Sequence, residues 1–186
     1  TATTPNGTSN GVNYTYSAGG TSYTTMLATP ADARVLSSSA GTNYGTIITL
    51  YVQKNASTEN ASYIKWDLNS VQGTTITSAK LRLYRAAGTA TTNKVYSCAT
   101  DTWIESGTGS ITWTNKPAWG TQQASFAVAA AAGYNEVDVT SYVSANFNGD
   151  KLVTMVIRDD QNLNVQCAYN SDENSSNKPQ LVVISQ

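Results

Sequence analysis

The chain has 186 residues and a formal net charge of −1, and only 12% of its residues are charged, about half the usual ~25%. It contains no His, which excludes His-based catalytic triads and His metal sites. Lys and Arg are scattered, no phosphate-binding glycine loop occurs, and no apolar run approaches the ~18 residues of a membrane span. Nucleic acid, nucleotides and a membrane span are therefore not expected.

The first 27 residues form a Thr/Ser/Asn/Gly-rich segment, and we place a domain boundary between residues 27 and 28. Residues 1–11 have the composition of a flexible linker. Within residues 12–27, apolar and aromatic residues alternate on both sides of Gly19-Gly20, which predicts a β-hairpin. Such a segment could add a strand to its own domain or pair with a neighbouring molecule, so self-association through residues 12–27 is one predicted interaction.

Residues 28–186 read as a series of short strands separated by turn residues. The alternation of apolar and polar side chains favours antiparallel strands with one buried face, and their spacing is typical of an all-β sandwich or jelly roll. The expected strands cover residues 32–37, 46–53, 62–68, 75–85, 93–100, 123–129, 134–143, 151–159, 162–171 and 179–185.

The predicted core follows from the same alternation. In the stretch 62–68, Ile64 and Trp66 share one face, and in the stretch 75–85 Leu81 and Leu83 do the same. We expect the following residues to form the shared core of the two sheets: Leu50, Ile64, Trp66, Leu81, Leu83, Val139 and Leu181.

The opposite face of these two stretches carries the candidate binding residues. Because the stretches are consecutive, we expect them to pair and to place two tyrosines and three cations on one outer face. Tyrosine rings stack on sugar CH groups, and Lys or Arg bind hydroxyls or carboxylates. An ordinary solvated sheet face is the alternative interpretation. The candidate carbohydrate-binding residues on this face are Tyr63, Lys65, Lys80, Arg82 and Tyr84.

Catalysis has little support, because the carboxylates lie in turns or at outward strand positions; we predict no enzyme and no required cofactor. Four oxygen-bearing side chains, Asp159, Asp160, Asn162 and Asn164, gather in one loop, which suits either a structural calcium ion or a plain turn. Cys98 and Cys167 permit either a disulfide or two separate buried thiols.

Several stretches together resemble a known family. They are DARV at 32–35, TNYG at 42–45, TLYV at 49–52, SYIKWDLNSV at 62–71, ITSAKLRLYR at 76–85, the segment 101–120 with its DTW, ITW and PAWG pieces, VDVTSYV at 137–143 and YNSDENSSNKPQLVV at 169–183. In order and spacing they resemble the DNRLRE-type, or disaggregatase-related, extracellular β-sandwich family, which includes alginate-binding modules. The chain departs from the family pattern at Trp66 (usually Phe), Trp119 (usually aliphatic) and Asp172 (usually Arg). Because it departs from the pattern, Trp119 is a further, exposed candidate for carbohydrate binding.

The resemblance implies an all-β, antiparallel two-sheet jelly-roll sandwich, in a secreted or cell-surface module that binds a polysaccharide without catalysis. The ligand it suggests is a uronate-containing polysaccharide such as alginate, although the missing arginine at position 172 weakens that suggestion. The alternative function is a structural or adhesive surface subunit, or a filament subunit, that assembles through its N-terminal strand.

Overall fold

A computed structural model describes residues 12–17, 20–29 and 31–186. In this part of the chain the structure has twelve strands, one α-helix and one 3-10 turn, η1 at Ser37–Ser39. The first six strands are β1 (Val12–Ser17), β2 (Gly20–Ala28), β3 (Ala31–Leu36), β4 (Thr49–Lys54), β5 (Glu59–Asp67) and β6 (Ile76–Gly88). The remaining elements are β7 (Thr92–Cys98), β8 (Trp119–Ala127), β9 (Gly133–Asp138), α1 (Thr140–Phe147), β10 (Leu152–Arg158), β11 (Gln166–Asn170) and β12 (Gln180–Ser185).

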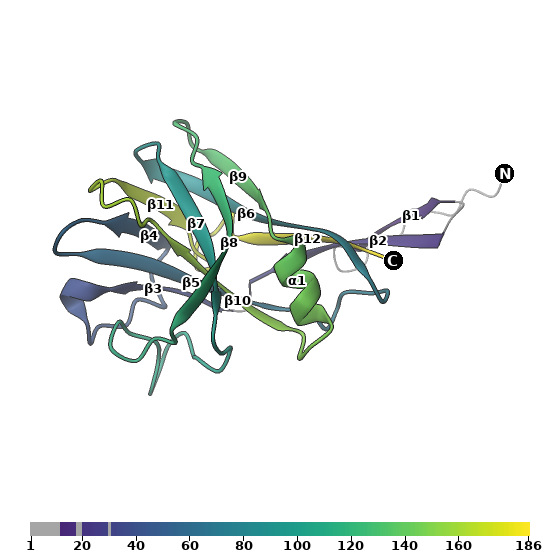
Figure 1. The fold of residues 1–186 in the computed structure, drawn as a ribbon, viewed down its shortest axis with the longest axis horizontal. Coiled ribbons are helices and arrows are strands. Elements are labelled where there is room, and N and C mark those ends of the chain that lie inside the picture. The colour runs from purple at the N-terminus through teal and green to yellow at the C-terminus, as the bar shows by residue number, and fades with distance from the viewer. Residues whose placement is uncertain (1–11, 18–19, 30) are drawn as a thin grey trace.

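All strand pairs are antiparallel, and the strands follow the order β1-β2-β12-β6-β11-β4-β5-β10-β7-β8, with β9 beside β6 and β3 beside β5. The contact between β4 and β5 is short, covering only Gln53↔Asn60 and Lys54↔Glu59. At this point the sheet curls into two layers (Figure 1). We call β2, β12, β6, β9, β11 and β4 the first layer, and β3, β5, β10, β7 and β8 the second layer. The predicted all-β antiparallel sandwich is confirmed.

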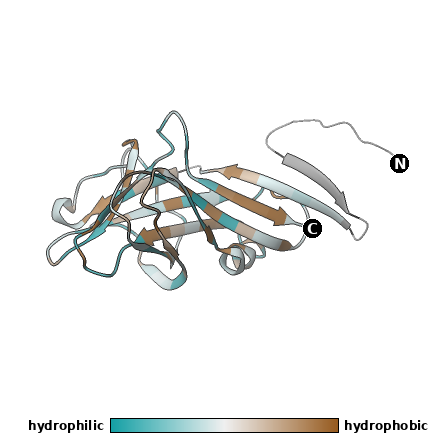
Figure 2. Ribbon diagram, turned by 90° about the horizontal axis from the view of Figure 1, so that it is seen from above, coloured by the Kyte–Doolittle hydropathy of each residue, from teal (hydrophilic) through white to brown (hydrophobic). Residues whose placement is uncertain are grey.

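The space between the layers holds the main hydrophobic core. Ile64 and Trp66 of β5 are fully buried there, as are Leu81 and Leu83 of β6 from the other layer. Figure 2 shows the hydrophobic segments distributed along the strands of the body. The core prediction is confirmed, because one buried cluster contains Leu50, Ile64, Trp66, Leu81, Leu83, Val139 and Leu181. Cys167 lies in the same cluster while Cys98 packs on the opposite side of the second layer, and both thiols are free.

A second cluster covers the outer face of the second layer. The long connection between β7 and β8, residues 99–118, places Trp103 and Ile111 on this face. The strands beneath carry small side chains, Ala31 and Ala33 on β3 and Ala61 on β5, which leave room for the large ring. As a result β5 is buried on both faces for most of its length.

The predicted pairing of β5 with β6 is wrong. The two strands lie in opposite layers, β5 between β3 and β10 and β6 between β12 and β9. Their apolar faces meet across the core instead of lying side by side. Alternation identifies which face of a strand is buried, but it does not identify the neighbouring strand.

The predicted strand over 134–143 is correct only in its first half. Strand β9 ends at Asp138, and helix α1 begins at Thr140. The Asp138 side chain accepts a hydrogen bond from the Thr140 N–H at 3.0 Å, which turns the chain. Val143 and Phe147, four residues apart, bury one face of the helix. Helix α1 is short, and no helix in the described ranges is long and apolar enough to cross a membrane.

The predicted N-terminal hairpin is present as β1 paired with β2, in a register that places Val12 opposite Thr25. Its predicted turn includes Gly19, which lies outside the described residues, as do residues 1–11. Strand β2 then runs along β12 of the same domain, from Tyr23 opposite Ser185 to Ala28 opposite Gln180. The proposed boundary at 27/28 falls inside β2. Figure 1 shows the β1–β2 end of the sheet extending beyond the body of the sandwich.

Candidate functional site

The outer face of the first layer brings together three of the predicted binding residues. Lys80 is exposed on β6, and Arg82 and Tyr84 are half-buried beside it. Strand β9 supplies their cross-strand neighbours, with Glu136 opposite Arg82 and Tyr134 opposite Tyr84. We call this face of β12, β6 and β9 the β6 surface.

Arg82 is the centre of the contacts on the β6 surface. Its Nε donates to Glu136 Oε1 at 2.7 Å, and its Nη1 donates to Gln180 Oε1 of β12 at 2.6 Å. Its guanidinium carbon also lies 4.5 Å from the centre of the Tyr134 ring. The Tyr134 and Tyr84 rings meet edge to face, with centres 5.3 Å apart. These contacts fix the rings and the guanidinium in one arrangement.

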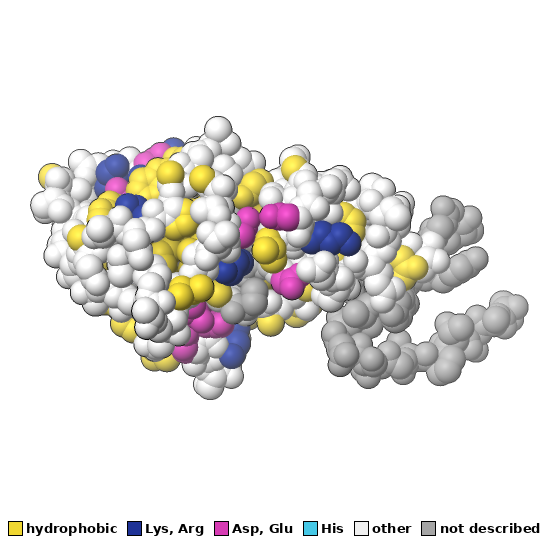
Figure 3. Space-filling view, turned by 90° about the horizontal axis from the view of Figure 1, so that it is seen from below, with side chains coloured by type: hydrophobic (Ala, Val, Ile, Leu, Met, Phe, Trp, Pro, Cys, Tyr) yellow, Lys and Arg dark blue, Asp and Glu magenta, His cyan; other side chains and the backbone are white. Residues whose placement is uncertain are grey.

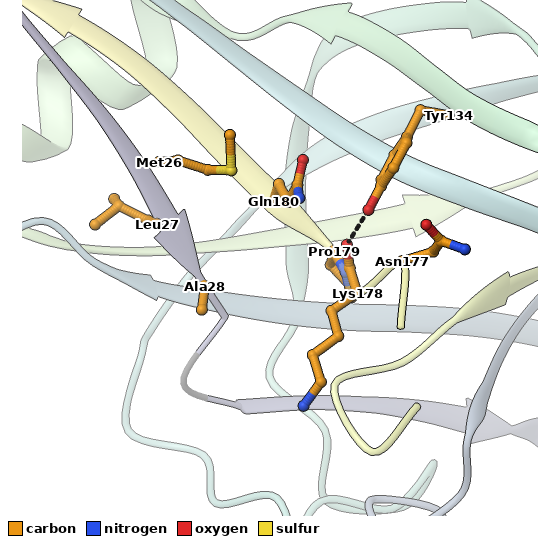
Figure 4. Close-up of a pocket in the computed structure, with 8 residues that line it drawn as sticks. All are labelled: Met26, Leu27, Ala28, Tyr134, Asn177, Lys178, Pro179 and Gln180. Atoms are coloured by element: carbon orange, nitrogen blue, oxygen red, sulfur yellow. Dashed lines mark hydrogen bonds between the residues drawn. The ribbon is translucent and has the colours of Figure 1, made fainter. Parts of the chain in front are cut away.

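A hollow of about 290 Å³ adjoins these residues, between β2 and the segment that leads into β12. Figure 4 shows Tyr134 on one side of it and Met26 on the other. The Tyr134 hydroxyl donates to the Lys178 carbonyl at 3.1 Å, and Met26 is 48% exposed. Burial raises the pKa of the Tyr134 hydroxyl. The full lining consists of Met26, Leu27, Ala28, Tyr134, Asn177, Lys178, Pro179 and Gln180.

Trp119 lies on the other layer, in a stack of aromatic rings and cations. The Arg158 guanidinium covers its ring at 3.9 Å, and Lys116 Nζ lies 5.2 Å from it. Both cations already have partners, because Arg158 binds Glu59 at 2.6 Å and Lys116 Nζ donates to the Trp113 carbonyl at 3.0 Å. A hollow of about 280 Å³ adjoins Trp119, so volume does not distinguish the two surfaces. Both arginines are paired with a glutamate, but Arg158, which covers Trp119, is only 7% exposed, whereas Arg82, which contacts Tyr134, keeps 26% of its side chain exposed. The β6 surface is favoured for this reason.

Tyr63 and Lys65 do not share the β6 surface, which corrects the predicted arrangement. Tyr63 is fully buried beneath the 99–118 connection, and its hydroxyl donates to the Pro117 carbonyl at 2.7 Å. Lys65 Nζ donates to the carbonyls of Asp101 at 3.0 Å and Trp103 at 2.6 Å. Both side chains anchor this connection to β5.

Figure 3 shows charged side chains in small groups on one face of the molecule, with uncharged surface between them. One acidic group was not predicted: Asp32, Glu105, Asp172 and Glu173 each place a carboxylate oxygen within 4.8 Å of the others. Burial, and next the charge of Asp172, raise the pKa of Asp32 to about 9. Burial and the neighbouring acids raise the pKa of Asp172 to about 7. Sequence reasoning missed this group because its members come from three distant segments.

In the loop at 159–164, considered for calcium, three side-chain oxygens accept hydrogen bonds from protein groups, whereas the buried Asp159 Oδ2 has no partner within the described ranges. Asp160 Oδ2 accepts hydrogen bonds from Lys94 and Tyr96, both at 2.8 Å. Asp159 Oδ1 accepts from the Gln161 N–H, and Asn164 Oδ1 accepts from Gln53 and Asn55. Positive φ angles at Asn162 and Asn164 are typical of the turn interpretation. Calcium at this loop stays a prediction.

An antiparallel sandwich that presents ordered aromatic, amide and guanidinium groups on an open sheet face is typical of a module that binds its ligand on its surface. The comparison with family models makes the assignment specific: the chain belongs to carbohydrate-binding module family 96, whose model matches residues 23–185. No curated protein matches the chain. Families of carbohydrate-binding modules are generally non-catalytic, which agrees with the expected glycan-binding role. This family match does not establish that the chain is of the DNRLRE type or that it binds alginate.

Proposed function

We propose that the chain binds a polysaccharide on the β6 surface, with one sugar ring in the hollow beside Tyr134. The single observation that supports this location is the contact between Arg82 and Tyr134, which prepares an aromatic ring and hydrogen-bonding groups next to an open hollow of about 290 Å³. A preformed site of this kind avoids the cost of ordering side chains on binding. Family membership supports the ligand class.

The chemistry of the lining suits a sugar. The Tyr134 ring and the exposed Met26 offer apolar surface to the CH groups of a sugar ring. The amides of Gln180 and Asn177 offer both donors and acceptors to its hydroxyls. The combination of a mostly apolar hollow and a few directed polar groups is typical of ligand sites.

The charge balance of the β6 surface favours a neutral polysaccharide over a uronate. Arg82 is paired with Glu136 at 2.7 Å, and Lys80 stands opposite Asp138 in the register of β6 and β9. Each of these two cations therefore has an acidic neighbour that would repel a carboxylate on the ligand. The charge of Lys178, in the lining of the hollow, likewise acts on an acid, Asp172. We propose that the module works outside the cell, where it tethers a larger enzyme or a cell surface to neutral polysaccharide.

Affinity electrophoresis through gels that contain a neutral β-glucan, pectin or alginate tests the proposal. Tyr134→Ala and Gln180→Ala should each weaken retention about tenfold, the change that corresponds to about 1.4 kcal/mol. Trp119→Ala is the matched aromatic control on the opposite layer and should keep the wild-type retention. Loss of retention in Trp119→Ala alone would move the site to the second layer, and no retention of the wild-type chain in any gel would contradict polysaccharide binding.

Self-assembly is the second candidate function, and one observation favours it. Strand β1 ends the sheet order, where it pairs with β2 as its one partner among the described strands. An edge strand can pair with a strand of another molecule. Because β2 pairs with β12 of its own domain, we propose that any such assembly would use β1.

A further inference from the structure

The acidic cluster joins three segments that are far apart in the sequence. Asp32 comes from β3, Glu105 from the connection between β7 and β8, and Asp172 and Glu173 from the connection between β11 and β12. One carboxylate oxygen of each lies within 4.8 Å of the others. Asp32 is 1% exposed, and the other three side chains are half-buried. Four carboxylates are thus held in a space the size of one coordination sphere.

Two oxygens of the cluster are buried without any donor. Asp32 Oδ2 accepts the Asp172 N–H at 2.9 Å, and Glu105 Oε1 accepts the Asp32 N–H at 2.7 Å. Asp32 Oδ1 and Glu173 Oε2, by contrast, are buried and find no hydrogen-bond partner within the described ranges. A buried carboxylate oxygen without a partner loses its hydration and gains nothing in return. The unpartnered oxygen of a nearly inaccessible Asp32 therefore points to a missing positive group.

Within the described ranges, no cationic side chain is paired with the cluster. In the described part of the chain, no Lys or Arg nitrogen forms an ion pair with any of the four acids. The lysines whose charge reaches the cluster are Lys65 and Lys178. Lys65 Nζ is bound to the carbonyls of Asp101 and Trp103, and the charge of Lys178 lowers the pKa of Asp172 without an ion pair between the two within the described ranges.

The position of Glu105 is set by neighbours outside the cluster. Asn43 Nδ2 donates to the Glu105 carbonyl at 2.7 Å and also to the Ile111 carbonyl at 2.8 Å. A side chain on residue 45 would collide with the Glu105 backbone, so Gly45 permits the close approach. The connection is thereby fastened where Glu105 faces Asp32.

We propose that Asp32, Glu105, Asp172 and Glu173 form a calcium-binding site. The donor set consists of carboxylate oxygens, which Ca²⁺ binds at 2.3–2.6 Å with six to eight ligands. Zn²⁺ prefers Cys and His, and the chain has no His. Mg²⁺ demands a stricter octahedron and keeps more of its water. Backbone carbonyls or water would complete the coordination.

The ion would link β3 to the connections 99–118 and 171–179. The second of these also carries Asn177, Lys178 and Pro179 into the hollow, so calcium would hold one wall of the sugar site in place. This consequence rests on the proposed function, whereas the metal site itself does not. A calcium measurement made without sugar separates the failure of one from the failure of the other.

Titration calorimetry of the chelator-stripped protein with CaCl₂ alone tests the proposal. We expect one bound ion, and a melting temperature about 5–10 °C higher at a hundredfold excess of calcium over Kd than in EDTA. Asp32→Asn and Glu173→Gln should weaken calcium binding about tenfold or more, because each removes a charged ligand. Asp67→Asn, an exposed carboxylate on β5, is the control and should bind as the wild type does.

Asp172→Arg keeps the proposal testable if the Asp32 variant fails to fold. Its guanidinium would supply the missing positive charge within the cluster, so we expect this variant to lose the calcium response and to melt higher in EDTA than the wild type does. Absence of binding heat, together with equal melting temperatures in calcium and EDTA for the folded wild type, would overturn the proposal. Equal affinity for Mg²⁺ would overturn the assignment to calcium.

Discussion

The guanidinium of Arg82 lies against the Tyr134 ring, with 4.5 Å between the guanidinium carbon and the ring centre, and this contact joins β6 to β9. The same guanidinium donates to Glu136 and Gln180. One arginine therefore orders an aromatic ring and an amide that line the hollow, and its own charge is balanced by Glu136.

Glu136→Gln should change ligand preference. Removal of the carboxylate leaves the Arg82 charge without its partner, so retention on alginate should rise about two- to fivefold, the range of an exposed charge pair. Retention on a neutral β-glucan should stay unchanged. Parallel affinity gels measure both, and Asp67→Asn controls for the change in net charge. Unchanged behaviour on alginate would mean that Arg82 does not face the ligand.

Lys65→Met should destabilise the fold, although lysine is usually a surface residue. Its Nζ donates to the carbonyls of Asp101 and Trp103, and loss of a donor to part-buried carbonyls costs about 2 kcal/mol. Lys80→Met, on the open β6 surface, is the matched control and should stay within about 0.5 kcal/mol of the wild type. Urea unfolding compares the two variants. Equal midpoints would show that Lys65 does not anchor the 99–118 connection.

Trp66→Phe should lower the free energy of unfolding only slightly, although the Trp66 side chain is large and buried. Trp66 is fully buried, and its Nε1 finds no hydrogen-bond partner in the described part of the chain. Phenylalanine removes this unsatisfied donor, which offsets part of the cavity that the smaller ring leaves. We expect the free energy of unfolding to fall by less than about 1.5 kcal/mol, compared with about 2–5 kcal/mol for Leu81→Ala in the same core. Thermal unfolding tests this, and a loss as large as that of Leu81→Ala would contradict it.

Two N-terminal deletions should separate folding from assembly. Deletion of residues 1–17 removes β1 but leaves β2 on β12, so the melting temperature should change little. Deletion of residues 1–28 also removes β2, which uncovers β12 and takes away the buried Leu27, so the melting temperature should fall clearly. Light scattering on both and on the full chain reports assembly. Concentration-dependent oligomers that disappear with residues 1–17 would support pairing through β1, and oligomers that persist would contradict it.

Much of the fold could be predicted from local pattern. Alternation along β5 and β6 identified the buried faces of Ile64, Trp66, Leu81 and Leu83, because a strand directs successive side chains to opposite sides whatever its neighbours are. The same alternation placed Lys80, Arg82 and Tyr84 on an outward face. The absence of His by itself excluded His-based catalysis and His metal ligands.

Only the tertiary structure decided what lies beside or above each outward face. Tyr63 and Lys65 alternate outward as Arg82 does, yet the connection 99–118 covers them, and no local pattern predicts where a long connection packs. Tyr134 and Gln180 reach Arg82 because β9 and β12 flank β6. Asp32, Glu105, Asp172 and Glu173 are separated by many residues and meet only when the chain folds. Strand alternation is a local property, so it can be recognised in the sequence. Strand order, loop placement and the charges that they bring together depend on contacts between distant residues.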